Sequence, residues 1–231
     1  MNDVLDNPVW HALTGPQSPF ARRGGHAARF APDVAPFFAI DGAGDEAYRD
    51  LARILGHAPE ARLFRPRSEP VPSGWRKTFE KPILQMVLPG DTGLPSECPQ
   101  LVRLEDADAA DTMALVERTR PGPFGARTMA LGTYLAIRRD GALVAMAGER
   151  LRLPGLVEIS AVAVDPAHRG RGFARTLTAA LAAQIRASGN VPFLHVFPDN
   201  DAAAGLYRSM GFATRAELIV VWLAHDGGRE G

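Results

Sequence analysis

The sequence of 231 residues has a single cysteine and no excess of charge of either sign. One cysteine, Cys98, cannot form an intramolecular disulfide or a cysteine metal cage, and it stands in no recognisable nucleophile context. The 26 basic residues equal the 26 acidic ones, so composition favours neither nucleic acid nor an anionic membrane as a partner. The few arginines near the glycine-rich turn suit a small anionic ligand better than a polyanion.

Long apolar runs are also missing. The longest, Leu218–Ala224, is far too short to cross a bilayer. The first residues, MNDVLDN, are acidic and lack the basic start and apolar core of a secretory signal. The expected location is the cytoplasm.

Proline is distributed unevenly and divides the chain. Of the 19 prolines, 13 lie in residues 1–99, where they favour turns and extended segments over helices. The stretch GDTGLPSECP at 90–99 has the composition of a linker. We predict an N-terminal α+β subdomain of unassigned function at 1–98, a regular α/β domain at 99–225 and a flexible tail at 226–231.

The second part alternates strands and helices with clear turn signals. Asp140-Gly141 and Pro154-Gly155 each join two apolar runs, which predicts an antiparallel meander. We expect strands at 101–104, 133–138, 143–153, 156–164, 192–197 and 219–223, helices at 106–118 and 172–188, and a short helix that starts at the cap candidates 199–201 and ends at Gly211. In the first part we expect helices at 7–13, with Pro8 in the first position, and at 45–57, with Gly56 near its end, and a strand at 83–88. The fold class is α/β (α+β), with a mixed, mostly antiparallel sheet flanked by helices.

The most informative stretch is EISAVAVDPAHRGRGFAR, Glu158 to Arg175. It starts as a β-branched strand, Asp165-Pro166 breaks the strand, and a glycine-rich turn leads into a helix. A helix N-terminus offers unpaired amides and a partial positive charge, and glycine lets a phosphate approach the backbone. The pattern predicts a pyrophosphate site.

A nicotinamide dinucleotide fits this turn poorly. Gly170-x-Gly172 supplies two glycines of the dinucleotide fingerprint, but Arg175 stands in the third position. The expected acidic residue should follow about 20 residues on, and Asp199 comes 27 residues after Gly172 (199 − 172). No GxxxxGK[ST] motif occurs, which excludes a P-loop.

A different family fits better. The segment from Arg169 to Ala174 follows R-x-x-G-x-A after a strand that ends Val-Asp-Pro, and DNDAAAGLYRSMGF carries Asn200 and Tyr207 downstream. Together these strings resemble the two signatures of the GNAT N-acyltransferase superfamily, in its glycine N-acyltransferase-like branch. The resemblance covers about residues 100–224.

The resemblance implies acyl-CoA, most simply acetyl-CoA, as donor and an amine as acceptor, with direct transfer and no metal. Tyr207 would act as general acid for the departing CoA thiolate. The oxyanion would be held by a backbone amide of the strand at 162–164. The residues implied to bind the cofactor are Val162, Ala163, Val164, Arg169, Gly170, Arg171, Gly172, Phe173, Ala174 and Asn200.

The attacking amine must also lose a proton, and two carboxylates are candidates for the base. Glu158 precedes the cofactor strand and is the first choice; Glu149 on the neighbouring strand, or a water, is the alternative. Each carboxylate could instead pair with a nearby arginine, Arg150 or Arg152.

Simpler roles are open for the other polar residues. Asn200 could cap a helix, Tyr207 could pack in the core, and His195 could be a hydrogen-bonded core histidine. For the whole protein, the alternative to an enzyme is an acyl-CoA-binding sensor without turnover. The acceptor, the acyl-chain preference and the choice between monomer and dimer stay open.

Overall fold

The computed structural model describes residues 4–90 and 101–226. Most of the predicted linker, with Cys98, and all but the first residue of the predicted tail lie outside these ranges. No helix within the two described ranges is long and apolar enough to span a membrane.

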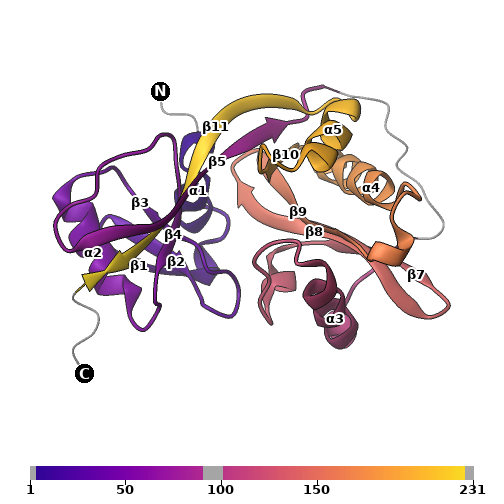
Figure 1. Ribbon diagram of the computed structural model, residues 1–231, viewed down its shortest axis with the longest axis horizontal. Helices are drawn as coiled ribbons and strands as arrows, with labels where there is room; N and C mark the ends of the chain where they lie inside the picture. The colour runs from indigo at the N-terminus through magenta and orange to yellow at the C-terminus, as the bar shows by residue number, and fades with distance from the viewer. Residues whose placement is uncertain (1–3, 91–100, 227–231) are drawn as a thin grey trace.

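A large mixed sheet dominates the fold (Figure 1). Within it β9 and β10 run parallel and the other paired strands run antiparallel. This confirms the predicted mixed, mostly antiparallel sheet flanked by helices. In spatial order its eight strands are β4 (Ala61–Arg65), β11 (Ala213–His225), β5 (Trp75–Val87), β10 (Val191–Val196), β9 (Leu156–Val164), β8 (Ala142–Leu153), β7 (Tyr134–Arg139) and β6 (Leu101–Arg103).

Helices cover both faces of this sheet. In Figure 1, α4 (Phe173–Ala187) and α5 (Asp201–Ser209) lie on one side and α3 (Ala109–Thr119) lies on the other. The four-residue spacing of Leu177, Leu181 and Ile185 predicts the buried stripe of α4, and all three side chains are buried in the core under that helix. The sheet is thus enclosed along the strands that precede the glycine-rich turn.

The N-terminal residues build a smaller sheet whose buried side chains share their core with strands β4, β5 and β11 of the large sheet. Strands β1 (Ala21–Gly24), β2 (Ala27–Phe30) and β3 (Phe38–Ile40) pair in that order. Helix α1 (Pro8–Leu13) starts with proline in its first turn, and α2 (Asp45–Leu55) ends before Gly56, as the sequence predicts. This sheet and both helices lie at the left of Figure 1.

The large sheet draws strands from both parts of the chain. Strands β4 and β5 come from the predicted N-terminal subdomain, yet β5 lies between β10 and β11. Strand β11 pairs with β5 from Ala213 to His225 and also with β4, so it runs across both halves of Figure 1. The division at residue 98 stays a prediction, and the two parts share one hydrogen-bonded sheet.

Candidate active site

Strands β9 and β10 pair at one end and separate at the other. Their parallel pairing covers Leu156–Glu158 opposite Val191–Phe193. Beyond this point β10 pairs with β5 on its other side, and among the described residues nothing pairs with β9 on the side that faces β10. His195 is half-buried although its side chain is only 1% exposed, so its exposure comes from the backbone. The sheet therefore opens beside residues 159–164 of β9, where an extended ligand can pair with free backbone groups.

A bulge lies in β9 at this opening. Opposite β8, the pairing steps from Gly148–Ser160 to Met146–Ala163, so β9 carries one extra residue. Ala161 adopts a positive φ of 51°, a conformation that costs an alanine about 1–3 kcal/mol. Because alanine gives no signal for a bulge, sequence reasoning missed it. The bulge changes the direction of Val162 and the residues after it.

The turn after β9 is fixed by its own polar groups. The Asp165 carboxylate accepts a hydrogen bond from Ala167 N at 3.0 Å and one from Arg118 Nε at 3.0 Å. The backbone donor of Ala167 and the charge of Arg118 lower the pKa of Asp165 against the opposing effect of burial. Gly170 (φ 76°) and Gly172 (φ 79°) then take left-handed conformations that favour glycine.

Helix α4 begins without a side-chain cap. Gly172 is its N-cap residue and makes no side-chain capping bond, so the amides of the first turn, from Phe173 on, are available to a ligand. A Cβ placed on Gly170 or Gly172 would meet nothing within 4 Å. Arg169 and Arg171 are exposed, and neither forms an ion pair with another described residue. This is the geometry of a phosphate site at a helix N-terminus.

Helix α5 carries the two residues of the second signature. Asn200 caps the helix, because its side-chain oxygen accepts from Ala203 N at 3.2 Å, which confirms the capping alternative. Tyr207 is buried, with its ring 5.9 Å from that of Phe212. Tyr207 shares one apolar cluster with Val162 and Phe173. The predicted acid, the predicted cofactor strand and the start of α4 thus contribute to one packed cluster.

Burial sets the ionisation of Tyr207. Desolvation raises the pKa of its phenol to about 12. No hydrogen bond of this hydroxyl to another described residue is present. The phenol is therefore neutral at physiological pH and can donate a proton.

Glu158 lies in a closed ion-pair network. Its carboxylate accepts two hydrogen bonds from Arg150, the longer at 2.8 Å, and contacts His195 Nδ1 at 2.7 Å. Gln85 Nε2 lies 3.1 Å from the other ring nitrogen of His195 and 2.9 Å from the Leu5 carbonyl oxygen. Since an amide nitrogen only donates, His195 accepts there and donates to Glu158 from Nδ1.

This network weighs against Glu158 as the base. Burial alone would raise its pKa, but the charge of Arg150 and the hydrogen bonds from Arg150 and His195 outweigh burial and lower the pKa to about 2. The side chain is 0% exposed. The ion-pair alternative for Glu158 and the core-histidine alternative for His195 both hold. Gln85, which fixes the histidine tautomer, carries no sequence signal.

Glu149 is also paired with an arginine, but through only one of its two carboxylate oxygens. One of its oxygens accepts from Arg152 at 2.7 Å and from Thr133 N at 3.3 Å, so the predicted alternative pair is also present. Its other oxygen makes no hydrogen bond to a described residue. Gly132 has to be glycine here, because a Cβ would lie 2.4 Å from the bonded Glu149 oxygen.

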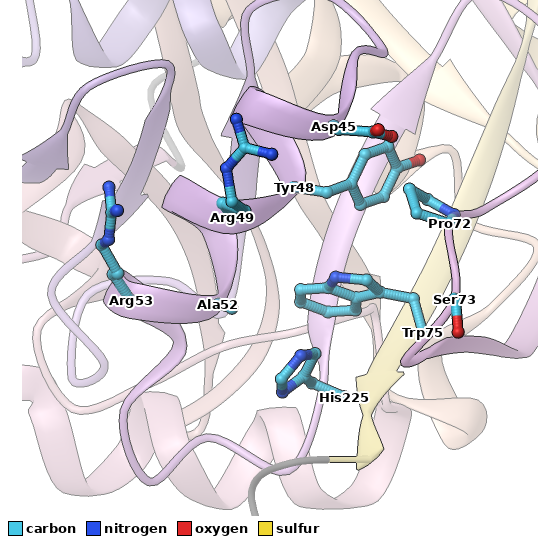
Figure 2. Close-up of a pocket in the computed structure, with 9 residues that line it drawn as sticks. All are labelled: Asp45, Tyr48, Arg49, Ala52, Arg53, Pro72, Ser73, Trp75 and His225. Atoms are coloured by element: carbon cyan, nitrogen blue, oxygen red, sulfur yellow. The ribbon is translucent and has the colours of Figure 1, made fainter.

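A hollow in the N-terminal part is separate from this site. Figure 2 shows Trp75 between Tyr48 and His225, facing helix α2. The ring centroids of Trp75 and His225 are 4.7 Å apart. None of the residues that line this hollow belongs to β9, β10, α4 or α5.

Comparison with known proteins agrees with this geometry. Residues 134–222 match the family model described as FR47-like protein. A crystal structure described as an acetyltransferase of the GNAT family, from Novosphingobium aromaticivorans, is 38% identical, covers 97% of this chain and 99% of its own, and superposes with a TM-score of 0.89. The fold of this chain is therefore shared with that structure over nearly its whole length. The chain belongs to the GNAT family.

Two curated relatives match over shorter stretches. N-alpha-acetyltransferase RimI of Mycobacterium tuberculosis is 46% identical over 82 residues, which is 34% of this chain and 51% of the relative. Mycothiol acetyltransferase of Nocardiopsis dassonvillei is 35% identical over 92 residues, 36% of this chain and 28% of the relative. The chain therefore spans about half or less of each of these relatives.

Proposed function

We propose that this protein is an N-acyltransferase that moves an acetyl group directly from acetyl-CoA to an amine. The observation that carries the proposal is the unpaired edge of β9, followed by the uncapped N-terminus of α4. An extended arm that ends in a pyrophosphate suits these two features together. Membership of the GNAT family supports the same donor.

Each predicted residue receives a role in holding the donor. The backbone of Val162 to Val164 pairs with the pantetheine arm, and the amides of Gly170 to Ala174 bind the pyrophosphate. Arg169 and Arg171 add positive charge near the phosphates. Asn200, whose side-chain oxygen caps α5, binds the same arm through its amide nitrogen.

The chemistry needs two proton transfers. The neutral amine attacks the thioester carbonyl carbon, the C–N bond forms and the C–S bond breaks. Tyr207 gives its phenolic proton to the departing CoA thiolate, and the amine proton passes to a base. A backbone amide of β9 holds the oxyanion.

For the base we assign Glu149 ahead of Glu158, since Glu149 keeps an oxygen free of hydrogen bonds to described residues. Replacing Glu149 with glutamine is expected to lower kcat about 10²–10⁴-fold, the range of a lost general base. Glu158→Gln is the comparison: it should lower thermal stability and leave kcat roughly unchanged. A large fall in kcat for Glu158→Gln together with little change for Glu149→Gln would assign the general base to Glu158.

The donor site can be tested by calorimetric titration with acetyl-CoA, with NAD as control. Gly172→Ala is expected to weaken acetyl-CoA binding at least about tenfold, because its Cβ would stand where the pyrophosphate approaches the backbone. Gly189→Ala is a matched control, since Gly189 lies at the other end of α4, has a φ of 77° against 79°, and also faces open space. Equal loss in both variants would show backbone strain alone.

The acceptor is to be found by screening. One curated relative is named for an α-amine and another for mycothiol, so peptides with free α-amino groups and small primary amines both belong in the screen. Release of CoA thiol with any of these amines would support the proposed N-acyltransferase activity. Tight acetyl-CoA binding without thiol release would support the alternative, an acyl-CoA-binding sensor without turnover. Assignment to the glycine N-acyltransferase-like branch and a cytoplasmic location remain predictions.

A further inference from the structure

The hairpin of the small sheet places two arginines directly opposite each other. Arg22 of β1 pairs in register with Arg29 of β2. Arg29 in turn lies opposite Phe38 of β3, with its guanidinium 4.5 Å from the ring centroid. Like charges at directly opposed positions destabilise a sheet. The arrangement therefore calls for a compensating charge.

The structure supplies only part of that compensation. Arg29 is 7% exposed, and its Nη1 donates to the carbonyls of Ile54 and Leu55 at the end of α2. Its Nε donates to Phe30 O at 3.3 Å. No carboxylate among the described residues pairs with Arg29 or Arg22, and Nη2 of Arg29 makes no hydrogen bond to any of them. Burial, and then the charge of Arg22, lower the pKa of Arg29.

Both arginines line a hollow of about 630 Å³. Its walls are mostly apolar, with Pro36 and Ile54 among them, and one carboxylate, Glu60, also lines it. Two further arginines at the hollow have partners of their own, because Arg53 pairs with Asp50 and Arg62 stacks on Trp222 at 4.3 Å. Arg22 and Arg29 pair with no carboxylate of a described residue, Glu60 included, and both lie beside the apolar wall. The volume is that of a small-molecule site.

We propose that this hollow binds a small organic carboxylate with a flat apolar body. The carboxylate lies between Arg22 and Nη2 of Arg29, where a guanidinium fork matches its two oxygens. The body packs on Pro36 and Ile54, which are half-buried. This ligand is separate from acyl-CoA, since the lining residues fall between 22 and 62 and the donor site is built from residues 159–207.

The test is calorimetric titration of the full chain with 2-naphthoate, 2-naphthamide, acetate and inorganic phosphate. We expect saturable binding of 2-naphthoate, and binding at least about tenfold weaker for the amide, which lacks the charge, and for acetate, which lacks the body. Arg22→Ala should weaken 2-naphthoate binding about tenfold or more without lowering the melting temperature, because it also removes the like-charge pair.

Arg23→Ala is the matched control. Arg23 is the next residue of β1, is exposed, and alternation turns it away from the hollow, toward Trp10. The Arg23→Ala variant should bind 2-naphthoate with the same affinity as the natural chain. Equal binding of the amide, equal binding of phosphate, equal loss in Arg22→Ala and Arg23→Ala, or no saturable heat up to about 5 mM 2-naphthoate would each overturn the proposal.

Discussion

Replacing Tyr207 with phenylalanine is expected to lower kcat by about 10²–10⁴-fold, the range of a lost general acid. The affinity for acetyl-CoA should stay within a few fold, because the phenylalanine ring keeps the apolar contact with Phe212. Burial raises the pKa of Tyr207 to about 12, so the acid is protonated across the physiological range. CoA-thiol release with an amine from the acceptor screen, alongside calorimetry, measures both quantities.

The control for this change is Tyr48→Phe. Tyr48 is also a buried tyrosine, but it lies beside Trp75 in the N-terminal part (Figure 2). Removing the Tyr48 hydroxyl should leave kcat unchanged. If Tyr207→Phe keeps kcat within about threefold, which is under 1 kcal/mol of barrier, a water rather than the phenol protonates the thiolate.

Replacing Arg150 with methionine is expected to destabilise the fold by about 3–5 kcal/mol, because it leaves the carboxylate of Glu158 buried and unpaired. The side chains of Arg150 and Glu158 are 12% and 0% exposed, so water cannot replace the lost partner. His195 would remain as a neutral donor only. Urea unfolding followed by circular dichroism gives the free energy of unfolding.

Two comparisons sharpen this result. Arg152→Met removes the partner of Glu149, but Arg152 is 37% exposed, and the expected loss is about 1 kcal/mol or less. The double variant Arg150→Met/Glu158→Leu should recover most of the stability, since replacing a whole buried pair by apolar groups is often neutral. A double variant as unstable as Arg150→Met alone would contradict the buried-charge explanation.

The ion pair of Arg150 and Glu158 also predicts how the free energy of unfolding changes in acid. The pKa of Glu158 is about 2 in the folded protein against an ordinary value of 4.5. Its contribution to stability is therefore fully present above about 4.5 and is lost as pH falls toward 2. The free energy of unfolding of Glu158→Gln should fall less steeply than that of the natural chain through this range.

The local elements of the second part were predictable because their signals lie close together in sequence. The turns at Asp140-Gly141 and Pro154-Gly155 and the stripe of α4 predict β7, β8, β9 and α4 to within a residue or two of their observed bounds. The glycine turn was also readable, since both the strand break at Asp165-Pro166 and the positive φ of the glycines are local requirements.

Long-range pairing was not predictable in the same way. The sequence predicts strands at 83–88 and 219–223, whereas β5 and β11 each run for 13 residues. Strand β5 contains Pro82 and several charged residues, which weaken any local strand signal. It is held by its pairing with β11, a partner more than a hundred residues away.

The sequence by itself determined the turn between β9 and α4 where we propose the donor site, because a strand break, glycines and a helix start are contiguous in the chain. Tertiary structure alone decided the rest. The separation of β9 from β10 depends on β5, and the buried state of Glu158 depends on Arg150 and His195 from two neighbouring strands. The ionisation of a side chain is set by which groups surround it, and packing rather than spacing along the chain chooses those groups.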